Sequence, residues 1–206
     1  MSRKNPGRGD QLRATIAQEA ARLMAEHGIH DFGLAKRKAA ERVGVTSEGA
    51  VLPRNVEIED ALRERQRLFG QGEHERELQR LRRAAVSAIK VLLQFEPRLV
   101  GPVLNGTATE HSDVQLHLFA DSPESVYLSL LDRQVPYEVF ERRLRLTADR
   151  QAVAIPGLRF EVGGQTIEAI IFPRDGIRQA PLSPVDGRPM KRADLEEVLD
   201  LVHGLS

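Results

Sequence analysis

The sequence predicts an α+β protein on three observations. Apolar residues recur at helical spacing through most of the first 95 residues. Beyond Pro97 the pattern changes to short segments in which apolar residues alternate with polar ones or run together, as they do in strands. A last amphipathic stretch covers Ala193–His203. We therefore expect a helical N-terminal region, residues 1–72, followed by an α+β domain, residues 73–206.

Three helices are expected in the N-terminal region. Gly28 and Gly44 follow the first two and mark their ends, because glycine favours the left-handed conformation that terminates a helix. The stretch Thr46–Asn55 contains Gly49 and Pro53 and is expected to be a loop. The expected helices are Gln11–His27, Ala35–Val43 and residues 55–69.

The α+β domain is expected to begin with a long amphipathic helix over residues 75–95. Ser122-Pro123 is a typical helix start, because serine caps the first turn and proline suits the first helical position. Gly163-Gly164 separates two apolar segments and predicts a hairpin. The other expected helices are residues 123–134 and 193–203, and the expected strands are residues 98–104, 113–119, 137–146, 158–162 and 166–172.

Composition narrows the class of protein. The chain has 206 residues, no cysteine, and 30 basic against 30 acidic residues. The lack of cysteine excludes a disulfide framework, a thiolate zinc site and a cysteine nucleophile. No apolar run approaches the roughly 18 residues of a membrane span, and the basic N-terminus lacks the apolar stretch of a signal peptide. We therefore expect a soluble, cytoplasmic, bacterial-type protein with no membrane partner.

The most informative segment covers residues 99–116. Gly101 follows a short apolar stretch, and twelve positions later Asp113 begins a strand whose polar face also carries Gln115. Side chains two positions apart on a strand point to the same face. Carboxylates placed in this way, with a third from a neighbouring strand, can hold two Mg²⁺ ions for phosphoryl displacement. As the carboxylate from the neighbouring strand we choose Glu168, the one charged residue of an otherwise apolar strand.

This pattern resembles the signature of the DNA polymerase β-like nucleotidyltransferase superfamily. In that family a strand ends in Gly-Ser, and Asp-hydrophobic-Asp follows on the next strand; Ser112-Asp113 matches the common lead-in, and the similarity covers about residues 75–172. The resemblance implies a mixed sheet flanked by helices, a bound nucleoside triphosphate, and Mg²⁺ or Mn²⁺. It implies catalytic and metal-binding roles for Asp113 and Glu168, a metal-binding role for Gln115, and cofactor-binding roles for Gly101, Gly106, Thr107 and Ser112.

Two residues depart from the family pattern. Gln115 stands where the second aspartate is expected, so the metal site has two negative charges instead of three. Pro102 stands where serine is expected and offers the phosphates neither an N–H group nor a hydroxyl. Both the metal site and the phosphate turn are altered. The sequence therefore predicts a degenerate site.

Two substitutes for the altered groups are conceivable. His117 lies on the same strand face as Asp113 and, with Glu168, would give a two-oxygen, one-nitrogen set that suits Mn²⁺ or Zn²⁺; the alternative is a half-exposed strand histidine. Gly106-Thr107 could replace Gly101-Pro102 as the phosphate turn, or it could be a plain tight turn. These alternatives stay open at the level of sequence.

The N-terminal region loosely resembles the DNA-binding end of TetR-type regulators. The resemblance rests on residues 38–46, which look like the entry to a helix-turn-helix, and on a basic excess of four over residues 1–54 (ten basic, six acidic). Pro53, however, would break the recognition helix expected near Thr46, and the rest of the chain is rich in strands, whereas the ligand domain of that family is helical. DNA binding is therefore the alternative prediction.

The preferred interpretation is a nucleotidyltransferase-like protein with a degenerate metal site and a nucleotide-binding or interaction role. If active, it would transfer a nucleoside monophosphate to an acceptor hydroxyl. A macromolecular partner or a second copy of the chain is compatible with the amphipathic helices at 11–27 and 193–203.

Overall fold

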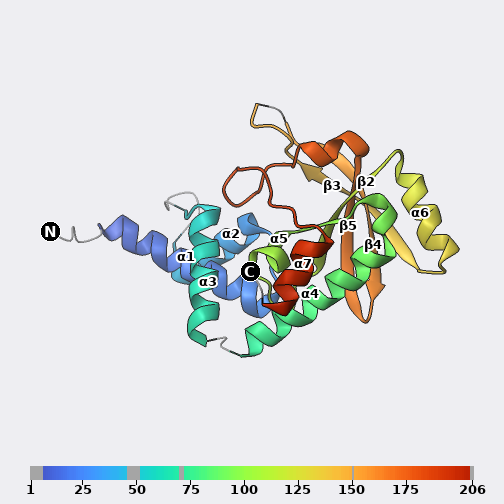
Figure 1. Ribbon diagram of the computed structural model, residues 1–206. Helices are drawn as coiled ribbons and strands as arrows, with labels where there is room; N and C mark the ends of the chain where they lie inside the picture. The colour runs from blue at the N-terminus through green and yellow to red at the C-terminus, as the bar shows by residue number, and fades with distance from the viewer. Residues whose placement is uncertain (1–6, 46–51, 70–71, 150, 205–206) are drawn as a thin grey trace. The chain divides into compact units, whose positions relative to one another are not determined.

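The computed structural model describes residues 7–45, 52–69, 72–149 and 151–204, which form seven α-helices and a five-stranded mixed sheet (Figure 1). This α+β architecture confirms the predicted fold class. The helices are α1 (Arg8–His27), α2 (Phe32–Val43), α3 (Asn55–Phe69), α4 (Glu73–Val91), α5 (Gly101–Asn105), α6 (Pro123–Asp132) and α7 (Leu195–His203), with short 3₁₀ helices η1 (Leu93–Phe95) and η2 (Arg174–Arg178). The strands are β1 (Arg98–Val100), β2 (Val114–Ala120), β3 (Tyr137–Leu144), β4 (Val153–Val162) and β5 (Gln165–Pro173).

The chain divides into two compact units, each with an apolar core of its own. The helical unit comprises the described residues up to Glu75 together with Thr109–Ser112 and Pro184–Asp186. The α+β unit comprises Arg76–Ala108, Asp113–Ser183 and the described residues from Gly187 onward.

In the helical unit, α1 packs against both α2 and α3. Small side chains allow close approach of the helices, since Ala20, Ala35 and Ala39 are fully buried there. The Asp31 carboxylate caps α2 by accepting a hydrogen bond from the Leu34 N–H, and Gly44 ends the helix in the left-handed conformation.

The sheet of the α+β unit has the strand order β1-β2-β5-β4-β3. β2 and β5 are parallel, and the other neighbours are antiparallel. The predicted hairpin between β4 and β5 is confirmed, with Gly163 and Gly164 both at positive φ in the two-residue turn. That turn fixes the register of the two strands that carry much of the candidate site.

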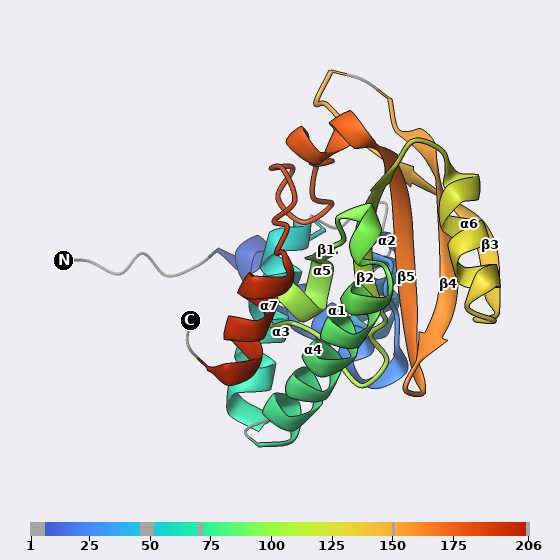
Figure 2. The same ribbon diagram turned by 45° about the vertical axis from the view of Figure 1, so that its right-hand side comes forward.

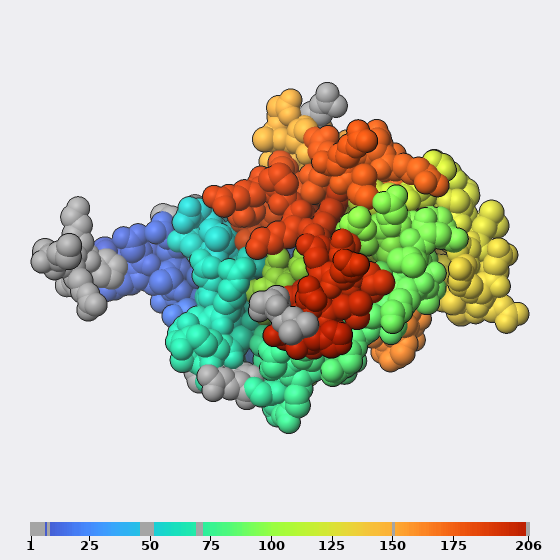
Figure 3. Space-filling view, viewed as in Figure 1, coloured from blue at the N-terminus to red at the C-terminus, as the bar shows by residue number. Residues whose placement is uncertain are grey.

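The two faces of the sheet differ. One face packs its apolar side chains, such as Leu116, Ala169 and Leu158, against α4, α6 and α7. Figures 1 and 2 show α4 and α6 along the sheet, and α7 lies beside α4 in Figure 3. The side-chain amide of Gln79 on α4 donates a hydrogen bond to the Leu201 carbonyl on α7 at 3.2 Å. The opposite face carries a small aromatic cluster and the polar residues of the predicted site.

Two expected segments differ from the structure. The strand expected over residues 98–104 stops at Val100, because Gly101-Pro102 begins the short helix α5, in which the missing proline N–H is not needed. The strand expected over residues 158–162 begins earlier, at Val153. Within the described ranges, no helix is long and apolar enough to cross a membrane.

Candidate functional site

A row of side chains crosses the polar face of the sheet from one edge to the other. Strand pairing places Val100 beside Gln115, Gln115 beside Glu168, Glu168 beside Arg159, and Arg159 beside Glu138. Gln115 and Glu168, two of the predicted metal ligands, are therefore neighbours across parallel strands. Asp113 immediately precedes β2, and its charge contributes to the raised pKa of Arg159.

Glu168 is buried, with a side chain only 4% exposed, and two arginines neutralise it. Arg142 Nη2 donates to one carboxylate oxygen at 2.8 Å, and Arg159 Nη2 donates to the other at 2.5 Å. Both guanidinium groups also lie over the Phe140 ring, each 5.6 Å from its centroid. The hydrogen bonds to Glu168 raise the pKa of Arg159, with smaller contributions from the charges of Asp113 and Glu138.

This arrangement does not fit a Mg²⁺ site. Both Glu168 oxygens already accept hydrogen bonds from cations, and Gln115 supplies a neutral amide. A hard divalent cation needs several anionic oxygens and would be repelled by the adjacent guanidinium groups. Across the described parts of the chain, no three histidine, aspartate or glutamate side chains lie together as a metal site.

The Gln115 side chain occupies the space next to Gly101, where the phosphate turn was predicted. Gly101 has φ +72°, and a Cβ at this position would collide with Oε1 of the Gln115 side chain. The other predicted contacts are engaged locally: the Thr107 N–H donates to the Pro102 carbonyl at 2.9 Å, and the Ser112 hydroxyl accepts from the Thr109 N–H at 2.9 Å. Gly106 ends α5 at φ +77°. These residues form turns in the structure.

Gly101→Ala is expected to lower the free energy of unfolding by about 2 kcal/mol, because it combines a positive φ with displacement of Gln115. Gly163→Ala is the matched control, with φ +59° and open space around the added methyl group; it should cost about 1 kcal/mol. In urea unfolding, the cost of Gly101→Ala should shrink in a Gln115→Ala background. Equal costs for the two glycines would mean that the Gln115 side chain moves aside without cost, contrary to this prediction.

His117 is a buried histidine, which corrects the expectation of a half-exposed strand residue. Its Nδ1 accepts a hydrogen bond from Arg192 Nε at 3.1 Å, so the neutral ring carries its proton on Nε2. Arg192 also donates to the carbonyls of Gly176 and Ile177. Burial, and then the charges of Arg192 and Arg142, lower the pKa of His117 to about 3. Since Arg192 holds Nδ1, His117 fits a structural role.

The cavity at the centre of this site is small. Its volume is about 30 Å³, and its lining includes Gln115, His117, Arg142, Glu168 and Met190. A space of this size holds about one water molecule. A nucleotide that reaches this site would therefore contact the outer, exposed parts of the two arginines.

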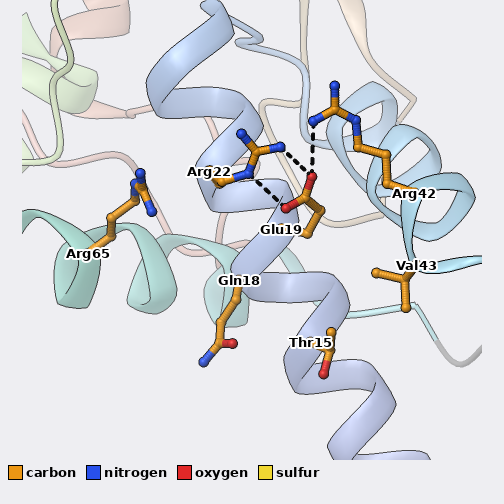
Figure 4. A pocket seen from close by; sticks show the side chains of 7 residues that line it. All are labelled: Thr15, Gln18, Glu19, Arg22, Arg42, Val43 and Arg65. Atoms are coloured by element: carbon orange, nitrogen blue, oxygen red, sulfur yellow. Dashed lines mark hydrogen bonds and ion pairs between the residues drawn. The ribbon is translucent and has the colours of Figure 1, made fainter.

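A larger hollow, about 550 Å³, lies on the helical unit, and Figure 4 shows its lining. Glu19 on α1 accepts hydrogen bonds from Arg22 at 2.7 Å and from Arg42 on α2 at 3.2 Å, which lowers the pKa of its carboxyl group. Arg65 on α3 pairs with Glu26. These ion pairs join α1 to α2 and to α3, and they leave the arginines around the hollow paired with carboxylates.

The recognition helix that would complete the predicted helix-turn-helix begins in a stretch outside the described residues. The expected recognition helix begins near Thr46, and residues 46–51 are not described. Three consecutive basic residues lie in α2: Arg37 and Lys38 are exposed, whereas burial lowers the pKa of Lys36.

Arg142 and Arg159 were absent from the predicted site. For Arg159 the sequence does hold a signal, because a two-residue turn at Gly163-Gly164 places residue 159 opposite residue 168. A single acid in an apolar strand also requires a counter-charge when it is buried. Arg142 reaches Glu168 from β3, the strand beyond β4, and only the folded sheet shows this.

Comparison of the chain with protein-family models, curated proteins and solved structures gives no match. The function is therefore argued from the chemistry of the site.

Proposed function

We propose that this chain is a nucleotidyltransferase-like protein whose α+β unit binds a nucleotide through arginine side chains without metal-dependent nucleotidyl transfer. The observation that carries the proposal is the engagement of Glu168 by Arg142 and Arg159. The carboxylate that the resemblance assigns to a metal ion serves instead to orient two guanidinium groups.

The two arginines retain the means to bind phosphate. A guanidinium group has five N–H donors, and the bonds to Glu168 use Nη2 of each residue. The side chains of Arg142 and Arg159 remain 38% and 46% exposed. Arginine suits planar, bidentate recognition of phosphate oxygens, and Glu168 holds both groups in place before a ligand arrives.

Thermal unfolding with each of the four nucleoside triphosphates, with and without Mg²⁺ or Mn²⁺, tests the proposal. A ligand at ~100 times its dissociation constant should stabilise the protein by about 2.7 kcal/mol, a shift of several degrees in Tm. We expect a shift that does not depend on the metal. Arg159→Ala should abolish it, whereas Arg143→Ala, on the opposite face of β3, should not.

Two results would overturn the proposal. A shift that requires the metal and disappears in Asp113→Ala would show a functional metal site. The absence of a shift with all four triphosphates would exclude nucleotide binding.

A further inference from the structure

We propose that two copies of this chain pair through β3 and join their sheets in an antiparallel dimer. The proposal rests on the sheet edge and does not require nucleotide binding, although it uses Arg142, which also donates to Glu168. β3 is the last strand of the sheet, and in the described part of the chain no strand pairs with its outer edge.

The two edges of the sheet differ in their protection. At the other edge, the backbone of Ala193 covers β1. The Leu99 N–H donates to the Ala193 carbonyl at 2.8 Å, and the Ala193 N–H donates to the Leu99 carbonyl at 2.9 Å. β3 instead presents eight residues of regular strand. An edge of this length is a template for pairing with another strand unless something covers it.

Exposed apolar side chains gather beside this edge. Among the large apolar residues of the described chain, the most exposed are Val139 on β3 (62%) and Leu131 (61%) and Leu128 (58%) on α6. Stacking of Tyr127 on Tyr137, with ring centroids 5.6 Å apart, holds α6 next to the start of β3, as Figures 1 and 2 show. A partner strand would therefore meet apolar surface as well as backbone groups.

The sequence of β3 is complementary to itself in one register. When Phe140 lies opposite Phe140 of the second copy, Glu138 lies opposite Arg142 on both sides of the two-fold axis. A shift that centres the axis on Glu141 sets two glutamates opposite each other, and one that centres it on Arg142 sets two arginines opposite each other. This charge pattern specifies a second copy of the chain as the partner.

Sedimentation analysis of the full chain from about 1 to about 100 μM, the range in which a weak interface dissociates, tests the dimer. We expect a mass near twice 23.0 kDa at the upper end. Glu138→Arg places an arginine opposite Arg142 of the second copy. This variant should raise the dissociation constant of the dimer at least tenfold. Glu161→Arg, an exposed charge reversal on β4, is the matched control and should leave it unchanged.

Cross-linking keeps the test decisive if a variant is unstable. Because the chain has no cysteine, Phe140→Cys should form a disulfide-linked dimer under mild oxidation, whereas Arg143→Cys, about 20 Å from its counterpart in this register, should not. A monomer at every concentration, or a dimer insensitive to Glu138→Arg with no cross-link at position 140, would overturn the proposal.

Discussion

Glu168→Gln is expected to lower the free energy of unfolding by about 2 kcal/mol. The amide keeps the shape of the side chain but removes the counter-charge of Arg142 and Arg159. Arginine cannot lose its own charge, so two like charges would be left together. The cost stays below that of a fully buried ion pair, because both guanidinium groups are partly exposed to water.

Chemical denaturation measures this effect. Glu161→Gln is the control, since it changes an exposed glutamate on the neighbouring strand and should stay within about 0.5 kcal/mol of the parent. In a double-mutant cycle, Arg159→Met should remove part of the penalty of Glu168→Gln. If Glu168→Gln cost no more than Glu161→Gln, the ion-pair cluster would not be a stabilising feature of the folded protein.

The second large effect is a pH dependence that originates at His117. Its pKa is about 3 in the folded chain, and the ordinary value of 6.5 applies to the unfolded chain. As the pH falls below 6.5, His117 becomes protonated in the unfolded chain but stays neutral in the folded chain. Acid therefore favours unfolding. The contribution to stability is complete above pH 6.5 and is lost progressively as the pH falls towards about 3.

Urea unfolding at pH 7 and pH 5 isolates this term, because most carboxylates remain ionised over that interval. The parent should lose about 2 kcal/mol more than His117→Asn, whose side-chain oxygen can still accept from Arg192 Nε but does not titrate. Equal losses for the two proteins would mean that the folded chain accommodates a protonated His117.

The fold class and most elements follow from local patterns. The alternation around Leu116 and Leu118 predicted β2, and the two glycines at 163 and 164 predicted the hairpin. The expected strand, residues 158–162, is shorter than β4, which also includes Pro156 and Gly157, two residue types that are uncommon inside strands. In the sheet, Gly157 makes room for the Phe140 ring, since a Cβ there would lie 2.8 Å from Phe140 Cζ. That reason lies on another strand and is not visible locally.

The sequence did not predict Arg142 and Arg159, nor the ion pairs that they form with Glu168. The sequence pattern selected Gln115 and Glu168, and the sheet makes them neighbours. The spacing gave no indication of what Glu168 binds, because Arg142 comes from a strand 26 positions away in sequence. The contact of Arg192 with His117 spans 75 positions and has no local signature at all.

We propose that Glu168 binds two guanidinium groups in place of a metal ion. Titration with Mn²⁺, followed by the electron paramagnetic resonance of the free ion, tests this assignment. We expect the parent protein to bind no Mn²⁺ at this site, and the combined variant Gln115→Asp, Arg142→Gln, Arg159→Gln, which restores a second acid and releases Glu168, to bind the ion. Mn²⁺ binding by the parent protein that is lost in Asp113→Ala would contradict the claim.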